Sequence, residues 1–387
     1  MHFLRSLQLS GFLSFAPWSD AIPLTPLNVV IGPNGSGKSN LIEAVELLHT
    51  TPLLGFSDAI GMGGGVEEWV WKGEGSQEWP FARIEASIAP LRRKQDYVLD
   101  YELDFGHGAR LIGVETLKHA DHAYYHYIKG DDPVVCDDDT LSPQERKLDA
   151  SKLIFNESIL SQLKGFDRYP VLTQVGELFS GFQTFREWSF GRSAQLRRPQ
   201  SADLPSNTLL PGSQNLGLLL NQLDHLGISA EFNRLLKRFL PRYQRYSTLV
   251  QGSTVQTYLH EDGFKEPISA ARLSDGTLRF MAMLALLLSP TPPPLLCIEE
   301  PELGLHPDAV TLLAEVITEA STRTQIIVTT HSDALVSAFT EQTESVLVCE
   351  YLGGSVLKRL ESAKLRSWLD EYSLGEIWRM GALGGNP

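Results

Sequence analysis

The sequence predicts an α/β fold with a mostly parallel core sheet, an antiparallel β layer and an inserted helical region. Three observations support this prediction. An apolar strand pattern leads through a glycine-rich loop into a helix over residues 27–49. Several short, alternating strand patterns follow before residue 130. The last third of the chain alternates strand and helix, as chains that form parallel sheets do.

The N-terminal part begins with strands over residues 1–32, the last of them the apolar run LNVVIG. The segment from Gly37 to His49 predicts a helix, because its apolar residues recur at helical spacing. After the glycine-rich turn Gly61–Gly65, four short segments are expected to form an antiparallel layer. They are EEWVWKG, FARIEASI, YVLDYELDF and AYYHYIKG.

Three parts are expected along the chain: an N-terminal lobe (1–140), a helical insert (141–241) and a C-terminal lobe (242–387). The acidic, turn-like segment 131–147 predicts the first boundary, and the insert reads as interrupted helices without a heptad run. The C-terminal lobe begins with two strand patterns, YSTLVQG and TVQTYLHEDG. It continues with an apolar helix ending at Leu288, the strand LLCIEE, a helix from Pro307 to Ala320 and the strand TQIIVTTH.

Composition indicates an ordinary globular protein, with 42% hydrophobic and 21% charged residues among 387. A formal net charge of −14 argues against coating nucleic acid by bulk charge, although it leaves room for a local basic groove. Three widely spaced cysteines argue against a disulfide framework and a cysteine zinc site. The longest apolar run is too short for a bilayer span, and the N-terminus lacks a signal pattern. We therefore expect a cytoplasmic protein without a membrane partner.

The stretch GPNGSGKS fits the pattern G-x-x-x-x-G-K-[ST] and lies between a predicted strand and a predicted helix, the context that this motif requires. Its glycines allow backbone N–H groups to surround phosphate oxygens, Lys38 reaches the β- and γ-phosphates, and Ser39 can bind Mg²⁺. The predicted phosphate-binding residues are Gly32, Asn34, Gly35, Ser36, Gly37, Lys38, Ser39 and Asn40.

Three further polar residues follow predicted strands. Glu299 and Glu300 end the strand LLCIEE, and His331 leaves the strand TQIIVTTH. Ligands bind at the carboxyl ends of parallel strands, so these side chains are expected beside the phosphates. Adjacent strand residues face opposite ways, which predicts separate roles for the two glutamates. We assign Glu299 to the Mg²⁺ shell, Glu300 to the attacking water, and His331 to the γ-phosphate as a second catalytic residue.

The stretch RLSDGTLRF, residues 272–280, reads as the start of the apolar helix. Ser274 or Asp275 can cap it, and Gly276 allows a ligand close to the backbone. The free backbone N–H groups and the positive end of the helix dipole make this helix N-terminus a potential anion-binding site. Yet the stretch contains no lysine, acid pair or nucleophile.

These pieces, in this order, resemble the nucleotide-binding heads of ABC-type ATPases. GPNGSGKS looks like Walker A, RLSDGTLRF like the signature motif, LLCIEEPE like Walker B, LGLHP like the D-loop and His331 like the switch histidine. LSDG and the glutamate at position 299 depart from the transporter pattern and are similar to the SMC/RecF/OLD-like branch. The ending GEIWRMGALGGNP further resembles a prokaryotic group of stand-alone predicted ATPases within that branch.

The resemblance implies that ATP is sandwiched between two heads. Ser274 and Gly276 would then touch the γ-phosphate bound by Lys38 of a second copy, with Asp275 beside them. Residues 302–307 would lie across the dimer seam. Gln162 is a candidate for the Q-loop glutamine, and Phe12 and Phe15 are candidates either for adenine contacts or for the core.

Two clusters receive separate interpretations. On a strand only His122 and His126 share a face, so the HADHAYYHY stretch, which also holds His119 and Asp121, is interpreted as a polar and aromatic sheet surface rather than a metal site. The basic stretch 234–246 is either a solvated helix face or a surface for nucleic acid or an acidic partner. The segment LRRKQ (91–95) is expected to be a turn.

The resemblance implies a Mg²⁺-dependent ATPase (ATP and water to ADP and phosphate) that acts as a homodimer or higher homo-oligomer. Members of the branch commonly act in DNA repair or antiviral defence, so control of a separate effector in prokaryotic defence is the leading hypothesis, with DNA or RNA binding left open. The alternatives are a RecF-like DNA-repair ATPase, a transporter-type subunit and a non-hydrolysing nucleotide sensor.

Overall fold

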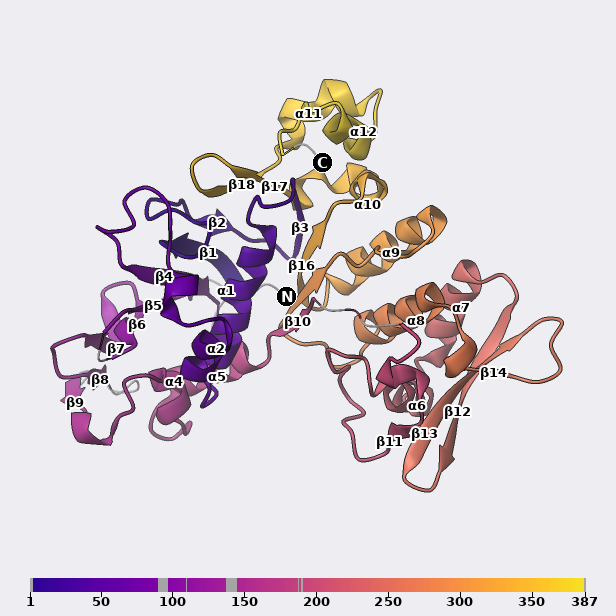
Figure 1. Cartoon of the computed structure of the whole chain (residues 1–387), viewed down its shortest axis with the longest axis horizontal. Helices are drawn as coiled ribbons and strands as arrows, with labels where there is room; N and C mark the ends of the chain where they lie inside the picture. Colours follow the sequence, from indigo (N-terminus) through magenta and orange to yellow (C-terminus); the bar gives the residue numbers. More distant parts are fainter. Residues whose placement is uncertain are drawn as a thin grey trace.

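The computed structural model describes residues 3–89, 97–108, 110–136, 145–186, 188 and 191–385. In this part of the chain the strands form three sheets (Figure 1). The eight-stranded sheet has the order β2-β1-β4-β5-β6-β7-β8-β9, and the six-stranded sheet has the order β10-β15-β16-β3-β17-β18. The four-stranded sheet has the order β11-β13-β12, with β14 paired to β13. This architecture confirms the predicted α/β class.

The six-stranded core sheet positions the expected site. Its strands are β10 (Gln183–Phe185), β15 (Leu295–Glu299), β16 (Gln325–Thr330), β3 (Leu27–Ile31), β17 (Val346–Tyr351) and β18 (Ser355–Arg359). All neighbouring pairs are parallel except β17–β18. Every residue of β3 and β16 is buried, as expected for strands covered on both faces. Because the strands are parallel, the segments that leave β10, β15, β16 and β3 emerge at one edge.

The antiparallel sheet forms the N-terminal layer, drawn in indigo to magenta in Figure 1. Strand β4 alternates between buried and half-buried residues, which is typical of a sheet with one face on the core. A single hydrophobic cluster joins this face to helices α1, α2, α4 and α5. The strands and helices of this layer are β1 (Leu4–Ser10), β2 (Ile22–Pro23), α1 (Lys38–Thr50), α2 (Phe56–Met62), β4 (Phe81–Ile88), β5 (Leu99–Gly106), β6 (Ile112–His119), β7 (His122–Ile128), β8 (Val134–Cys136), β9 (Glu145–Lys147), α4 (Ile159–Gln162) and α5 (Pro170–Ser180).

The expected strand EEWVWKG is wrong. Its first half forms helix α3 (Val66–Trp69), and only Val70 makes an isolated bridge, to Phe12. Gly65, with φ of +89°, turns the chain into this helix, and the first helical turn carries Glu67 and Glu68. Carboxylates favour the positive end of a helix, so the local charges agree with the helix rather than with a strand.

The third sheet supports a group of helices on the opposite side of the molecule (Figure 1). In α8 every residue from Thr277 to Leu287 is buried, which explains why its sequence is apolar all round. Helix α8 spans Asp275–Leu287 and contacts α6 (Leu216–His225) and α7 (Ser229–Phe239). The strands of the third sheet are β11 (Gln200–Ser201), β12 (Tyr243–Gln251), β13 (Thr254–Glu261) and β14 (Ile268–Ser269). The remaining helices are α9 (Pro307–Ala320), which matches the expected bounds, α10 (Asp333–Ala338), α11 (Ser362–Leu369) and α12 (Leu374–Arg379).

The three-part division of the chain stays a prediction. The expected insert does contain α4 to α7, but β9 pairs with β8 of the antiparallel sheet and β10 pairs with β15 of the core sheet. Both strands have three residues, too few for a periodic pattern in the sequence. No described helix combines the length and the apolar character needed to cross a membrane.

Candidate functional site

The loop between β3 and α1 has the close packing that its glycines predict. Gly32 has a φ of +149°, and a Cβ atom there would lie 2.2 Å from the carbonyl oxygen of Cys349. Gly37 has a φ of +108°, and its Cβ would lie 2.1 Å from Ser355 Oγ. Only glycine fits these two positions. Asn34 and Gly35, in contrast, are exposed on the outside of the loop.

Lys38 is the buried cation of this loop. Its ammonium donates hydrogen bonds of 2.8 Å each to the carbonyl oxygens of Gly32 and Pro33. Burial lowers the pKa of Lys38, against the opposing effect of Cys349, Glu300 and Glu299. Backbone carbonyls are neutral acceptors, and phosphate oxygens form stronger, charge-assisted bonds with an ammonium group. Lys38 is therefore placed to exchange these carbonyls for a phosphate.

Serine and asparagine side chains hold the loop in place. Ser355 Oγ donates to the carbonyl oxygen of Ser36 at 2.6 Å and lies 2.6 Å from Ser14 Oγ, which accepts from Asn40 Nδ2 at 2.7 Å. Asn40 thus ties α1 to the segment after β1. Ser36 Oγ is buried and has no hydrogen-bond partner among the described residues. A buried donor without a partner suits a loop that receives an oxyanion.

Ser39 and Glu299 meet at the edge of the core sheet. Ser39 Oγ donates a hydrogen bond to Glu299 Oε1, although the two residues are far apart in the sequence. A hydroxyl and a carboxylate are hard oxygen donors, the class that Mg²⁺ prefers together with phosphate oxygens. The residues present therefore fit Mg²⁺, and their role as its ligands stays a prediction.

Glu300 lies outside β15, which corrects one detail of the expectation. Its φ is +45°, and its N–H donates to the carbonyl oxygen of Thr329 at 3.0 Å. A turn, not strand alternation, separates its side chain from that of Glu299. Glu300 Oε1 lies 3.8 Å from His331 Nε2. Left-handed backbone at a non-glycine residue is costly and clusters at functional sites, so this turn itself marks the position.

His331 is placed where the sequence predicted, directly after β16 and opposite Glu300. Burial lowers the pKa of His331 and is the largest effect on it. The charge of Lys38 lowers this pKa further, while Glu300 and Glu299 act to raise it. The net lowering favours the neutral imidazole near neutral pH. In that form one ring nitrogen donates a hydrogen bond and the other accepts one.

Arg186 is a site residue that sequence reasoning missed. It follows β10 and contacts three carboxylates: Nε lies 3.1 Å from Glu299, Nη1 3.0 Å from Glu46 and Nη2 3.1 Å from Glu43. Burial acts to lower its pKa, but the hydrogen bonds and charges of Glu299 and Glu46 outweigh that effect and raise it. The available signal was Glu43 and Glu46, two acids at i, i+3 on the helix after the P-loop.

The start of α8 is held by its own chain. Ser274 is the N-cap, and its Oγ accepts from the N–H of Thr277 at 3.1 Å. Asp275 forms an ion pair with the buried Arg197. Gly276 lies against the expected D-loop, since a Cβ there would be 3.1 Å from the carbonyl oxygen of Gly304. Ser274 and Asp275 are exposed, so this helix start is open to a second molecule.

The expected seam 302–307 divides into two parts. Glu302 points inward: its carboxylate accepts from Thr330 Oγ1, and burial raises its pKa. Leu303, Gly304 and His306 are exposed. The surface part of the segment therefore begins at residue 303.

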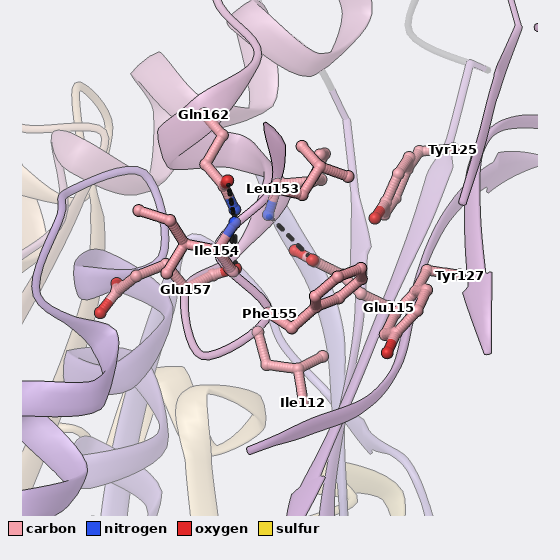
Figure 2. Close-up of a pocket in the computed structure, with 10 residues that line it drawn as sticks. Ile112, Glu115, Tyr125, Tyr127, Leu153, Ile154, Phe155, Glu157 and Gln162 are labelled. Carbon is pink, nitrogen blue, oxygen red and sulfur yellow. Dashed lines mark hydrogen bonds between the residues drawn. The ribbon is translucent and has the colours of Figure 1, made fainter. Parts of the chain in front are cut away.

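Three other candidates lie outside this edge. The amide of Gln162 donates to backbone carbonyls of Ile154 and Glu157, closing its own loop beside the pocket shown in Figure 2. In this position Gln162 stabilises its own loop and does not contact the P-loop. Phe12 and Phe15 are fully buried and belong to the core.

The histidine and basic clusters also have structural explanations. His119 stacks on Tyr97, and the described residues contain no cluster of three or more His, Cys, Asp or Glu side chains that could hold a metal. In the basic stretch, Arg234, Lys237, Arg238 and Arg242 each pair with a carboxylate. This pairing favours the solvated helix face over a nucleic-acid surface. The LRRKQ segment lies outside the described residues.

A family of known domains matches most of the chain. The family described as "AAA domain, putative AbiEii toxin, Type IV TA system" matches residues 27–105 and 152–337. The chain belongs to this family. Together the matched stretches include the edge described above, from the P-loop to His331. Membership in this AAA family implies nucleotide binding, and it confirms the predicted relation to ABC-type ATPases of the SMC/RecF branch.

Curated relatives match short stretches of the chain. The chromosome partition protein Smc of Mycobacterium tuberculosis is 30% identical over 133 residues, 30% of this chain and 10% of that protein. The DNA replication and repair protein RecF of Gloeobacter violaceus is 48% identical over 48 residues, 12% of each protein. The chromosome partition protein Smc of Halothermothrix orenii is 46% identical over 44 residues, 11% of this chain and 4% of that protein. The chain thus spans about a tenth or less of the length of these relatives.

Solved structures show the fold over nearly the whole chain. An Smc head bound to the C-winged helix domain of ScpA has a TM-score of 0.59 at 14% identity, covering 94% of this chain and 99% of that one. An Smc head with an extended coiled coil from Pyrococcus furiosus, bound to the C-terminal domain of ScpA, has a TM-score of 0.56 at 14% identity and covers 96% and 99%. This member of the AAA family therefore has the fold of an Smc head.

Proposed function

We propose that the protein is a Mg²⁺-dependent ATP hydrolase that works as a homodimer, in which the P-loop of one copy and the start of α8 of another enclose each ATP. One observation carries the proposal. The edge of the core sheet brings together Lys38, Ser39, Glu299, Glu300 and His331, whereas the start of α8 is an exposed, capped helix end without catalytic side chains.

The P-loop residues bind and orient the phosphates. Lys38 leaves the carbonyls of Gly32 and Pro33 for phosphate oxygens, and the backbone N–H groups of the loop donate to the same anion. Ser39 and Glu299 would hold Mg²⁺, which neutralises charge on the phosphates when bound. The buried hydroxyl of Ser36 gains an acceptor in the process.

Glu300 and His331 act on the water and on the γ-phosphate. The carboxylate of Glu300 accepts a proton from the attacking water, because Glu300 directly follows Glu299, whose carboxylate accepts a hydrogen bond from Ser39 of the P-loop. His331, neutral through its lowered pKa, donates a hydrogen bond to a γ-phosphate oxygen without adding a fixed charge. Glu300 Oε1 and His331 Nε2 lie 3.8 Å apart, so the two side chains stand side by side and can face the same reacting group.

The start of α8 completes the site of the second copy. Its first N–H groups and the Ser274 hydroxyl provide donors for the γ-phosphate, and the helix dipole favours that charge. Hydrolysis then requires two chains, so the ATP state sets the assembly state. We place the dimer in the cytoplasm, where its engagement controls a separate effector in prokaryotic defence; the toxin–antitoxin description of the family supports this context.

A RecF-like role on DNA is the second candidate. The identity to RecF over 48 residues favours it, whereas the paired cations of the basic stretch do not. Duplex DNA binding that requires ATP and is lost on reversing charge at Arg238 and Arg242 would select this alternative.

Glu300→Gln provides the test, because it removes the general base and retains the P-loop. With ATP and Mg²⁺ this variant is expected to bind ATP without turnover and to double its mass in light scattering, whereas Lys38→Ala stays monomeric and nucleotide-free. A Glu300→Gln protein that remains monomeric at saturating ATP contradicts the homodimer. The trapped protein can then serve as bait for an effector.

A further inference from the structure

The segment Leu374–Gly385 supports the nucleotide site from behind, although it lies outside the residues matched by the family. It contains α12 and the glycine-rich turn that follows. Helix α12 packs against α10 (Figure 1). The contact is close: a Cβ on Gly375 would lie 2.1 Å from the carbonyl oxygen of Asp333. Since α10 begins two residues after His331, the segment is anchored next to the switch-histidine position.

The turn after α12 is fixed by two hydrogen bonds. The indole N–H of the buried Trp378 donates to the carbonyl oxygen of Gly385 at 2.6 Å, and the N–H of Gly385 donates to Glu350 Oε1 at 3.0 Å. Gly384 and Gly385 have φ values of +77° and +52°. This backbone conformation favours glycine and brings the chain back to β17.

Gly385 then contacts the P-loop. A Cβ on Gly385 would lie 2.7 Å from Val348 Cγ1, 3.2 Å from the carbonyl oxygen of Cys349 and 3.4 Å from the Cα atom of Gly32. Gly32 is the residue whose carbonyl oxygen accepts from Lys38 and which is packed on its other side by Cys349. The turn therefore confines the first residue of the phosphate loop.

We infer that Gly385 is a positioning residue for nucleotide binding: it holds Gly32, the first residue of the P-loop, in the conformation that receives phosphate. The inference rests on the proposed function, since it concerns ATP at the P-loop. It gives residues 381–385 a role, because a Cβ at position 385 would force Val348 Cγ1 and the carbonyl oxygen of Cys349, which packs against Gly32, to shift. The same segment joins the P-loop to α10, and so links the two strand ends that meet the γ-phosphate.

Gly385→Ala and Gly353→Ala form a matched pair that separates this contact from backbone strain. Gly353 has a φ of +72°, comparable to that of Gly385, but a Cβ there has no atom within 4 Å. Both variants bear the cost of a left-handed alanine, and only Gly385→Ala presses on Val348 and on the Cys349 carbonyl that packs against Gly32. Trp378→Phe is a milder third variant, since it removes the donor to Gly385 and keeps an aromatic ring in the core.

Affinity for a fluorescent ATP analogue with Mg²⁺ is measured beside the nucleotide-free melting temperature. Gly385→Ala is expected to bind about tenfold more weakly, because a displaced P-loop loses oriented phosphate contacts, while Gly353→Ala stays within about twofold of wild type. Trp378→Phe is expected between them, and it decides the matter if Gly385→Ala does not fold. The inference is overturned if Gly385→Ala and Gly353→Ala bind the analogue with equal affinity. If Gly385→Ala does not fold, wild-type affinity in a folded Trp378→Phe protein overturns it instead. Failure of wild type to bind the analogue, or binding by Lys38→Ala, instead overturns the proposed function.

Discussion

The edge of the core sheet and the start of α8 are both ready to receive phosphate, but they differ in what surrounds them. At the sheet edge, Lys38, Glu299 and Glu300 converge from distant parts of the sequence. At the start of α8, the nearby polar groups serve the helix itself: Ser274 caps it and Asp275 pairs with Arg197. On this difference we base the proposed division of labour, in which one region performs chemistry and the other recognises the phosphate of a second chain.

Lys38→Ala should have the largest effect, because it removes both phosphate binding and charge stabilisation at the sheet edge. We expect kcat/KM for ATP hydrolysis to fall by about 10⁴-fold, with a large part of the loss in affinity. Steady-state kinetics and binding of a fluorescent ATP analogue measure the two parts. Substantial ATP affinity in a folded Lys38→Ala protein would contradict the placement of the phosphates.

Glu300→Gln should remove catalysis without removing binding. Loss of a general base lowers kcat by about 10³-fold, and ATP affinity should stay near that of wild type. Glu315→Gln is a suitable control, because Glu315 is an exposed residue of α9 that forms an ion pair with Arg238 and lies outside the proposed site. A Glu300→Gln enzyme with a normal kcat would show that another group activates the water.

Ser274→Arg tests the other region. Because Ser274 is exposed and belongs to no described contact of the P-loop, the variant should bind ATP as well as wild type but hydrolyse it about 10²-fold more slowly. The cap is lost as well, so a Ser274→Ala control measures that part. Normal hydrolysis by Ser274→Arg would leave α8 as a capped core helix only.

The contrast between the two regions was largely predictable from the sequence, and the exceptions are informative. The P-loop, the strand before Glu299 and helix 307–320 follow from local patterns, and the structure places them as expected. The role of Arg186 could not be predicted for two reasons. The strand β10 before it has only three residues, and the carboxylates that Arg186 contacts, those of Glu43, Glu46 and Glu299, come close to it only in the folded chain. The turn at Glu300 likewise depends on a positive φ, and a glutamate in the sequence gives no sign of a positive φ.

Arg186→Gln should change the metal dependence of the sheet edge. Arg186 Nε lies 3.1 Å from Glu299 Oε2, so a Mg²⁺ ion held by Glu299 would share this carboxylate with a fixed cation. Without the guanidinium, we expect nucleotide binding to need about tenfold less Mg²⁺, because a nearby positive charge no longer opposes the ion. Titrating Mg²⁺ at fixed fluorescent ADP measures this, with Arg238→Gln as the control. An unchanged Mg²⁺ midpoint together with a lowered melting temperature would make Arg186 a structural ion pair only.

Glu115→Gln should have the smallest effect on turnover and a distinct effect on stability. Burial raises the pKa of Glu115 to about 7, although hydrogen bonds from Ser158, Ile159 and Tyr101 act to lower it. Figure 2 shows Glu115 among the residues that line a pocket of the antiparallel layer. Between the ordinary glutamate pKa of 4.5 and this raised pKa of about 7, the folded state therefore holds a proton that the unfolded state releases. Wild type should lose about 1 kcal/mol of stability per pH unit across this window, relative to the Gln variant.

Urea unfolding at two pH values inside that window gives the comparison. Parallel changes in wild type and Glu115→Gln would contradict the raised pKa. ATP affinity of Glu115→Gln at neutral pH should match that of wild type, because Glu115 lies in the antiparallel sheet and its hydrogen bonds go to Tyr101, Ser158 and Ile159 of the same layer. This variant therefore separates a loss of stability from a loss of the site.

Mixing Lys38→Ala with Ser274→Arg tests the division of labour most directly. Each variant alone lacks one half of every site, but a mixed dimer combines the intact P-loop of the Ser274→Arg chain with the intact α8 start of the Lys38→Ala chain. Each mixed dimer has one complete site where the wild-type dimer has two, so ATP hydrolysis should recover to about a quarter of the wild-type rate if the chains assort at random and to about half if only mixed dimers form. If the mixture of two folded variants stays at the rate of the separate proteins, the two regions do not form a shared site.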